Sequence, residues 1–274
     1  MTNASPSRKL QALILAGWRN ESREDPLSQV NSVHKAFIDI GGVYMIERVI
    51  QTLQHIDSID EICISAPQEI RSRFEGLQRS YQNLRLMDAS TSPAASIEMA
   101  VGSLPDDTQL LVTTCDHALL TPEMVQYFLD AIDRESYGVA AACVLQDIFT
   151  AAFPNASRTF VRFNGFTFSG ANLFWLKKGA SEPLVHFWRQ LEMHRKKPVK
   201  MANQIGLMLG MQYLSGMLTK EKFLKKIEQK TSVKADLIPM PYPKAAIDVD
   251  KPKDLELVRS IIQNGHLTQG VKVA

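Results

Sequence analysis

Short apolar runs alternate with helix-like segments through the first half of the chain, and this alternation limits the folds that the chain can adopt. Each run is short, apolar on both faces and rich in branched residues, which is typical of a strand buried on both sides of a sheet. Strands that alternate with helices favour a doubly wound, Rossmann-like, mainly parallel sheet. We therefore predict an α/β fold. The four clearest strand-like runs cover residues 10–16, 61–65, 110–115 and 139–145.

The segments between these runs have the periodicity and the start signals of amphipathic helices. Apolar residues from Met45 to Ile56 recur at helical spacing. Ser92-Pro93 and Thr121-Pro122 each combine a capping side chain with a proline in the first turn, which predicts two more helix starts.

The second half of the chain has a different pattern. Residues 182–230 are predicted to form a helical insertion before the last strand, within a single domain that spans residues 1–274. Strand-like runs follow at residues 235–240 and 246–249, and a final helix is expected from Lys251 to about Gln263. The methionine-rich part of the insertion contains polar amides, so we expect no membrane span.

Composition excludes several classes of protein. A net charge of +2 is too small for a typical nucleic-acid binder. The polar N-terminus predicts no signal peptide, and hence a cytoplasmic protein. Cys63, Cys115 and Cys143 are odd in number and widely spaced, so we expect reduced core thiols rather than disulfides or a zinc site.

The loop after the first strand-like run is a candidate phosphate-binding segment. Gly17 directly follows the run and allows a ligand to approach the backbone closely. Arg19 and the loop amides suit phosphate oxygens, although a simple turn explains the glycine equally well. Lys35, in the segment VHKAF, is a second candidate for binding phosphate as a point charge.

Three aspartates are candidate metal ligands. Asp116 follows a buried strand, where ligands of α/β sheets bind, and a carboxylate there can hold Mg²⁺. Asp248 and Asp250 alternate along a short predicted strand and so share one face. Because Asp250 can also cap the following helix, we favour Asp248 as the second carboxylate.

The order of these motifs resembles a known family. LAGWR, HKAF, TTCDHALLTPEM, SGANLF and IDVDKPKDL follow one another from Leu10 to about Ile262. This order is similar to the nucleotidyltransferases of the nucleotide-diphospho-sugar transferase fold, in the MobA-like branch related to molybdopterin-guanine dinucleotide synthase.

The resemblance implies a function and a set of site residues. An NMP unit from CTP or GTP would pass to a phosphorylated or hydroxylated small molecule, and pyrophosphate would be released. Lys35, Arg19 and Asp116 would be catalytic, and Asp116 with Asp248 or Asp250 would hold Mg²⁺. The residues implied to bind the nucleotide are Leu15, Ala16, Gly17, Trp18, Arg19, Lys35, Ser92 and Ser96.

Two other functions are compatible with the sequence. A glycosyltransferase of related fold would use a nucleotide-sugar, but such enzymes often carry a DxD pair where this chain has Asp116-His117-Ala118. A non-catalytic nucleotide-binding regulator is the second alternative, favoured by the bulky Trp18 in the glycine loop. The apolar, methionine-rich stretch is compatible with a homodimer contact, a lid over the acceptor or plain core.

Overall fold

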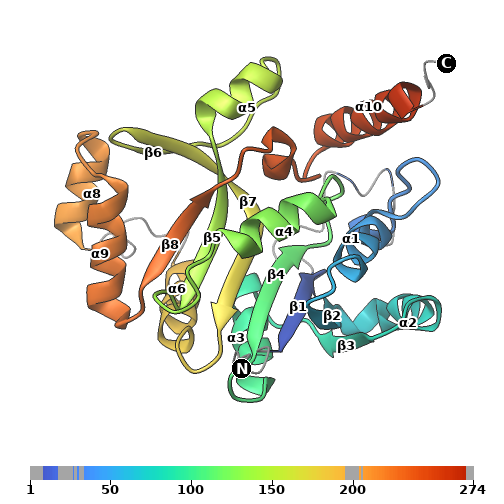
Figure 1. The fold of residues 1–274 in the computed structure, drawn as a ribbon, viewed down its shortest axis with the longest axis horizontal. Helices are drawn as coiled ribbons and strands as arrows, with labels where there is room; N and C mark the ends of the chain where they lie inside the picture. The colour runs from blue at the N-terminus through green and yellow to red at the C-terminus, as the bar shows by residue number, and fades with distance from the viewer. Residues whose placement is uncertain are drawn as a thin grey trace, which may run out of the picture.

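A mixed, mainly parallel sheet forms the centre of the molecule (Figure 1). The computed structural model describes residues 9–17, 27, 30, 34–194, 204 and 206–269. Within these residues the sheet has eight strands, in the order β3-β2-β1-β4-β7-β5-β8, with β6 paired to β7. The strands are β1 (Leu10–Leu15), β2 (Ile59–Ala66), β3 (Leu84–Asp88), β4 (Gln109–Thr114), β5 (Val139–Leu145), β6 (Val161–Phe163), β7 (Phe166–Lys177) and β8 (Ala235–Pro239).

The direction of the strands brings the connecting loops to one edge of the sheet. β3, β2, β1 and β4 are parallel to their neighbours, whereas β7 runs antiparallel to both β4 and β5. β8 is parallel to β5. β6 is antiparallel to β7 and so runs in the same direction as β4 and β5. The carboxyl ends of all strands except β7 therefore point toward the same edge, which is where α/β sheets bind ligands.

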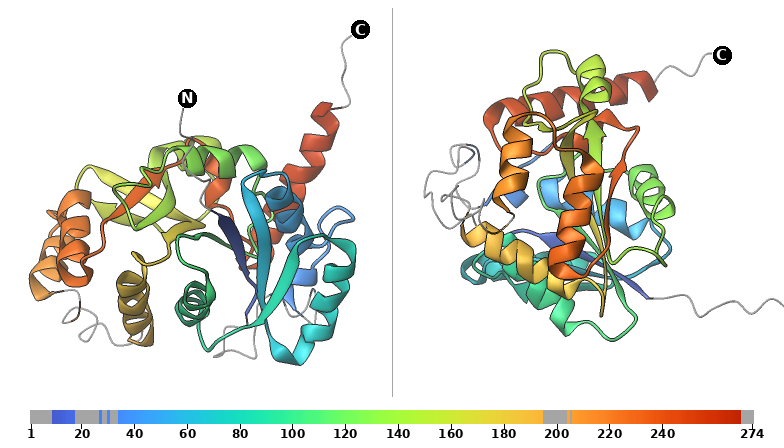
Figure 2. Two further views of the ribbon diagram at one scale, coloured as in Figure 1. Left: turned by 60° about the horizontal axis from the view of Figure 1, so that its bottom comes forward. Right: turned by 90° about the vertical axis from the view of Figure 1, so that its left-hand side faces the viewer.

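Helices cover both faces of this sheet (Figure 2). The sequence of β1 shows why: Ala12 and Ile14 belong to one core cluster, and Leu13 belongs to the other. The helices are α1 (Met45–Gln54), α2 (Arg71–Ser80), α3 (Pro93–Ser103), α4 (Pro122–Asp130), α5 (Gln146–Ala152), α6 (Glu182–Met193), α8 (Leu207–Leu214), α9 (Lys220–Thr231) and α10 (Pro252–Gln269), and the 3₁₀ turns are η1 (Lys35–Phe37), η2 (Gln68–Ile70) and η3 (Pro243–Ala246).

The predicted fold class is confirmed, and so are the helix starts. Ser92 accepts a hydrogen bond from the amide of Ala95 at 3.2 Å, and Thr121 accepts one from Met124 at 3.4 Å. Helices α6, α8 and α9 lie between β7 and β8, where the sequence predicts a helical insertion. The division of the chain into one domain with an insertion stays a prediction.

One predicted strand is wrong. Residues 246–249 form no strand; instead η3 ends at Ala246, and the chain then runs in an extended form toward α10. Its apolar side chains, including Ile247, are fully buried in the core, which explains the strand-like pattern. The amide of Val249 donates to the carbonyl of Asp116 at 3.0 Å, so this segment is tied to the end of β4.

The cysteines and the helices agree with two further expectations. Cys63, Cys115 and Cys143 are all buried and free, as predicted. In the part of the chain that the structure describes, no helix combines the length and the apolar character that crossing a membrane requires.

Candidate active site

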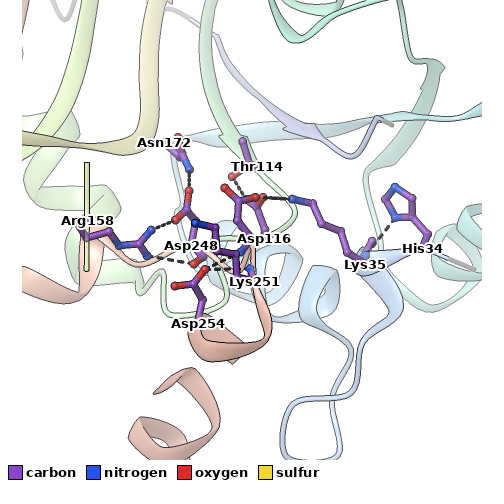
Figure 3. Close-up of polar contacts among 11 residues, drawn as sticks. His34, Lys35, Thr114, Asp116, Arg158, Asn172, Asp248, Lys251 and Asp254 are labelled. Carbon is purple, nitrogen blue, oxygen red and sulfur yellow. Dashed lines mark hydrogen bonds and ion pairs between the residues drawn. The ribbon is translucent and has the colours of Figure 1, made fainter. Parts of the chain in front are cut away.

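Lys35 contacts two aspartates that come from distant parts of the chain, and Figure 3 shows its contact with one of them, Asp116. Its ammonium group, on η1, donates to the carboxylate of Asp116, directly beyond β4. It also donates to Oδ1 of Asp250, just before α10, at 3.1 Å. The three residues therefore meet at the ligand-binding edge of the sheet, although the sequence separates them by 81 and 215 positions.

Local contacts hold each of these side chains in place. The hydroxyl of Thr114 donates to Oδ1 of Asp116, while Lys35 donates to Oδ2. The imidazole Nδ1 of His34 accepts from the amide of Ala36 at 3.1 Å, which caps η1 and fixes the backbone that carries Lys35. The sequence offered no specific signal for Thr114 or for the capping role of His34.

Asp254 caps the start of α10. Its Oδ2 accepts from the amide of Lys251 at 3.0 Å and from that of Asp250 at 3.3 Å. The side chain of Asp250 contacts Lys35 at 3.1 Å, so Asp250 takes part in the cluster around the ammonium group. The capping role that the sequence suggested for Asp250 stays a prediction.

The electrostatics of Lys35 and Asp116 favour their charged forms. Burial on its own would lower the pKa of Lys35, but the negative charges of Asp116 and Asp250 outweigh it and raise that pKa. Burial would likewise raise the pKa of Asp116, but the charge of Lys35 and hydrogen bonds from Lys35 and Thr114 lower it. The site therefore contains a buried ion pair at neutral pH.

The residues present fit a magnesium ion. The carboxylates of Asp116 and Asp250 both contact the ammonium of Lys35. A divalent cation likewise needs carboxylate oxygens that point toward one position. Within the described ranges, no group of three or more His, Cys, Asp or Glu residues is arranged to hold a metal. Mg²⁺ is commonly held by one or two carboxylates together with substrate phosphates, so Asp116 and Asp250 suffice.

Asp248 has different partners. Arg158 donates to its Oδ1, and Nδ2 of Asn172 donates to its Oδ2 at 2.8 Å. Arg158 also donates to the backbone carbonyl of Asp248 at 3.1 Å. Burial raises the pKa of Asp248, although the charge of Arg158 opposes this effect. Because both carboxylate oxygens are engaged, these contacts favour Asp250 over Asp248 as the partner of Asp116.

Asn172 contacts Asp248 because of an irregularity in β7. The register between β5 and β7 shifts between Ala141 and Cys143. Asn172 lies in the facing part of β7 and has a φ of 46°, which is left-handed backbone that asparagine tolerates better than most residues. Bulges of this kind redirect side chains near active sites. The segment SGANLF drew attention to this region, but Arg158 gave no signal of its own.

The glycine loop after β1 lies against the segment after β3. The amide of Ala16 donates to Ser65 at 2.9 Å, and the carbonyl of Leu15 accepts from Cys115 at 3.0 Å. A Cβ on Gly17 would lie 3.3 Å from the Cβ of Ala89, so the two segments are in close contact. Trp18 and Arg19 lie outside the described residues, and their roles stay predictions.

Ser92 and Ser96 have structural partners at the start of α3. Ser92 caps the helix, and the hydroxyl of Ser96 accepts from the amide of Ser90 at 2.9 Å. Both serines therefore shape the loop that follows β3, next to Gly17. Direct contact between these hydroxyls and a nucleotide stays a prediction.

We expect the Gly17→Ala variant to bind nucleotide less tightly while it keeps its fold. The added methyl group meets Ala89 at 3.3 Å, so the loop must shift by a few tenths of an ångström. We expect a loss of about tenfold in affinity for Mg²⁺–NTP, or about 1.4 kcal/mol, measured by titration calorimetry. Gly102→Ala is the control, because nothing lies within 4 Å of a Cβ at that exposed helical position. Equal affinities in the two variants would contradict the role of Gly17.

His117 lies beside Asp116 but is buried, with 1% of its surface exposed. Burial lowers its pKa from the model-peptide value of 6.5 to about 4, and the charge of Asp116 offsets this only in part. Its Nδ1 is 3.4 Å from the hydroxyl of Thr113. At neutral pH the imidazole is therefore uncharged.

This shift predicts a loss of stability in acid. Between pH 6.5 and pH 4 the unfolded chain binds a proton at His117 and the folded chain does not. The free energy of unfolding should therefore fall as the pH falls through this range, by up to roughly 3 kcal/mol. Urea unfolding at several pH values measures it. His117→Gln should flatten this part of the curve, and the exposed control His55→Gln should not.

Comparisons with known proteins agree with this geometry. The sequence matches no protein of curated function. Among solved structures, a hypothetical transferase from Thermus thermophilus is 24% identical and has a TM-score of 0.74, with 90% of this chain and 99% of that one covered.

Two further solved structures share the fold at lower identity. A 4-diphosphocytidyl-2C-methyl-D-erythritol synthase from Anaerococcus prevotii is 12% identical, with a TM-score of 0.58, and covers 94% of this chain and 97% of its own. A CMP:2-keto-3-deoxy-manno-octonic acid synthetase, solved with CTP, is 13% identical, with a TM-score of 0.58 and coverage of 94% and 99%.

The family model of the MobA-like NTP transferase domain matches residues 12–191, well over half of the chain. This range contains most of β1, the glycine loop, Lys35 and Asp116. The match therefore includes the residues that converge at the carboxyl edge of the sheet, apart from the aspartates before α10. The chain belongs to the family of MobA-like NTP transferase domains.

Proposed function

We propose that this protein is a Mg²⁺-dependent nucleotidyltransferase that transfers an NMP unit from an NTP to a small-molecule acceptor and releases pyrophosphate. The observation that carries the proposal is the contact of Lys35 with both Asp116 and Asp250 at the carboxyl edge of the sheet. Membership of the NTP transferase family supports the same reaction class.

Each residue has a role that follows from its position. Asp116 and Asp250 would hold Mg²⁺, and this ion would neutralise the charge that develops on the phosphates. The ammonium of Lys35 already lies at the two carboxylates. It can therefore turn to the triphosphate when nucleotide and metal bind there. The loop amides after β1, and Arg19, would stabilise the pyrophosphate as it leaves.

The reaction itself depends mainly on positioning. An acceptor oxygen attacks the α-phosphorus in line, the bond from that phosphorus to the bridging oxygen breaks, and pyrophosphate leaves with the electron pair. His117 is buried and neutral, and we assign no general base to it.

CTP is the first nucleotide to test, and GTP the second. The names of two proteins that share the fold refer to a diphosphocytidyl compound or to bound CTP. The resemblance to the molybdopterin-guanine dinucleotide branch keeps GTP as a candidate. A cytoplasmic location, a possible homodimer and the lack of nucleic-acid binding stay predictions from the sequence.

A thermal-shift panel tests the proposal. CTP, GTP, UTP and ATP are each added with and without Mg²⁺, to the wild type and to Asp116→Asn. A nucleotide at about 100 times its dissociation constant stabilises the fold by roughly 2.7 kcal/mol. We expect one NTP to stabilise the wild type only with Mg²⁺, and the variant to lose this effect. Absence of any shift with all four nucleotides would contradict the proposal.

The products separate this reaction from its main alternative. A nucleotidyltransferase releases pyrophosphate, whereas a glycosyltransferase releases a nucleoside diphosphate from a nucleotide-sugar. Analysis of the products with the stabilising nucleotide therefore distinguishes the two.

A further inference from the structure

Exposed apolar side chains gather on α8 and on the turn that follows it. The sequence from Gly206 to Thr219 contains no Asp, Glu, Lys or Arg. Leu214 is 87% exposed and Met208 is 65% exposed. Single exposed apolar residues are common on proteins, but a contiguous group of them marks an interaction surface. The exposed residues of this group, which we call the α8 patch, are Met208, Met211, Tyr213, Leu214 and Met217.

The α8 patch is not part of the core, because another side of α8 already packs on the rest of the molecule. Leu209 and the nearby Leu218 belong to a core cluster with phenylalanines of β6 and β7. Met208, Met211 and Leu214 recur every three residues and so lie along a different face of the helix. Figures 1 and 2 both show α8 at one end of the molecule, beside α9. The patch therefore lies on a protruding end of the fold.

Lysines of α9 lie beside α8. Lys222, Lys226 and Lys230 follow one another at a spacing of four residues, so they share one face of α9. The Cε atom of Lys226 lies 3.6 Å from the position of a Cβ on Gly206, the residue before α8. The two glutamates of α9 lie on a different face of that helix. An apolar surface and a positively charged surface are thus adjacent.

We propose that α8 and α9 form a docking surface for an anionic lipid bilayer, with the α8 patch in the interfacial layer and the α9 lysines at the headgroups. Amphipathic helices bind membranes through the apolar area that they bury and through attraction of basic residues to anionic lipid. Because α8 carries no charged residue, it can enter the interfacial layer without the cost of desolvating a charge. Tyr213 suits the headgroup level, where tyrosine is enriched.

The charge of this surface favours a bilayer over a second copy of the chain. In a two-fold dimer the same surface would contact itself. The lysines of the two copies would then lie close together and repel one another. An anionic bilayer instead attracts them. The protruding position of α8 and α9 also allows them to reach an extended, flat surface (Figure 2).

Sedimentation of the full chain with lipid vesicles tests this proposal. Vesicles of phosphatidylcholine alone are compared with vesicles that contain equal amounts of phosphatidylcholine and phosphatidylglycerol. We expect the partition coefficient to be at least about tenfold larger for the anionic vesicles. Raising the NaCl concentration from about 0.1 M to about 0.5 M should reduce this difference, because salt screens the attraction.

Two double variants separate the apolar contribution from the charged one. Met211→Gln/Leu214→Gln removes apolar side chains from the α8 patch and should weaken binding to anionic vesicles by about tenfold. Lys222→Gln/Lys226→Gln removes two positive charges of α9. It should weaken the same binding by about tenfold or more, since each lysine near an anionic surface contributes about fivefold.

Matched controls make the same chemical changes elsewhere on the surface. Met99→Gln replaces an exposed methionine of α3, and Lys251→Gln/Lys253→Gln replaces two exposed lysines at the start of α10. Both positions lie apart from α8 and α9 (Figure 1). The controls should bind anionic vesicles as the wild type does. All variants should keep the wild-type melting temperature, which shows that a loss of binding does not come from unfolding.

Several results would overturn the proposal. One is failure of the wild type to sediment with anionic vesicles, and another is wild-type binding by both double variants. A change of oligomeric state in Met211→Gln/Leu214→Gln, measured by light scattering, would assign the α8 patch to an interface between copies instead. Binding of an acidic amphipathic peptide that anionic vesicles do not displace would assign it to a protein partner. None of these measurements involves a nucleotide, so their failure would leave the proposed function untouched.

Discussion

The Asp116→Asn variant should lose nucleotidyl transfer by about 10³-fold while it stays folded. Asparagine has nearly the same shape as aspartate, so the packing at the end of β4 changes little. The variant lacks the negative charge that holds Lys35 and that would hold Mg²⁺. Charge stabilisation at the reacting phosphates is the main contribution of such a site, which is why the effect on turnover should be large.

The effect on stability should be much smaller. Lys35 keeps its contact with Asp250 at 3.1 Å, so its buried charge is not left without a partner. We expect a loss of about 1–3 kcal/mol in the free energy of unfolding, which urea titration measures.

Turnover is measured as pyrophosphate release from the NTP that stabilises the wild type with Mg²⁺. Asp130→Asn is the control, because it makes the same chemical change at an exposed position on α4. Turnover by Asp116→Asn within tenfold of the wild type would exclude Asp116 from the catalytic role.

The sequence predicted the strands whose apolar pattern along the chain matches their burial in the sheet. β1, β4 and β5 are apolar along most of their length because helices cover both faces of the sheet. β3 was missed, since it is short, lies at the sheet edge and carries Arg85 and Asp88. Residues 246–249 were assigned to a strand because burial of Ile247 and Val249 in a connecting segment imitates the pattern of one.

The sequence also predicted some residues of the candidate site and missed others. Asp116 was predicted from the end of an apolar run, where position along the chain already implies position in the sheet. Lys35 was predicted from its place in VHKAF, just before an apolar segment. Arg158 and Asn172 were not, because their roles depend on the register shift in β7 and on the path of a loop. The different partners of Asp248 and Asp250 needed the structure too, since only the folded chain places Lys35 against Asp250 and Arg158 against Asp248.

Replacing Lys35 by methionine should make the stability of the fold depend strongly on Mg²⁺. The ammonium of Lys35 lies between two carboxylates and neutralises their repulsion. Methionine has a similar length but no charge, so Asp116 and Asp250 would face each other without a cation. Removal of one partner from a buried ion pair costs about 3–5 kcal/mol.

A divalent cation can restore part of this loss in the variant. In the wild type, Mg²⁺ must displace the ammonium, whereas in Lys35→Met the position is open. We therefore expect Mg²⁺ alone to raise the melting temperature of the variant more than that of the wild type. Because one group of carboxylates would bind either cation, the larger response of the variant identifies the metal position without any assay of activity.

Lys244→Met is the control for this experiment, because it removes an exposed lysine close to Asp248 in sequence and leaves the cluster intact. Its melting temperature should respond to Mg²⁺ as that of the wild type does. An equal response in all three proteins would mean that Asp116 and Asp250 do not bind the metal, and Asp248 would then have to be tested as the alternative ligand. A Lys35→Met variant that is as stable as the wild type without Mg²⁺ would show instead that the carboxylates avoid their repulsion by binding a proton, and its stability would then fall as the pH is raised.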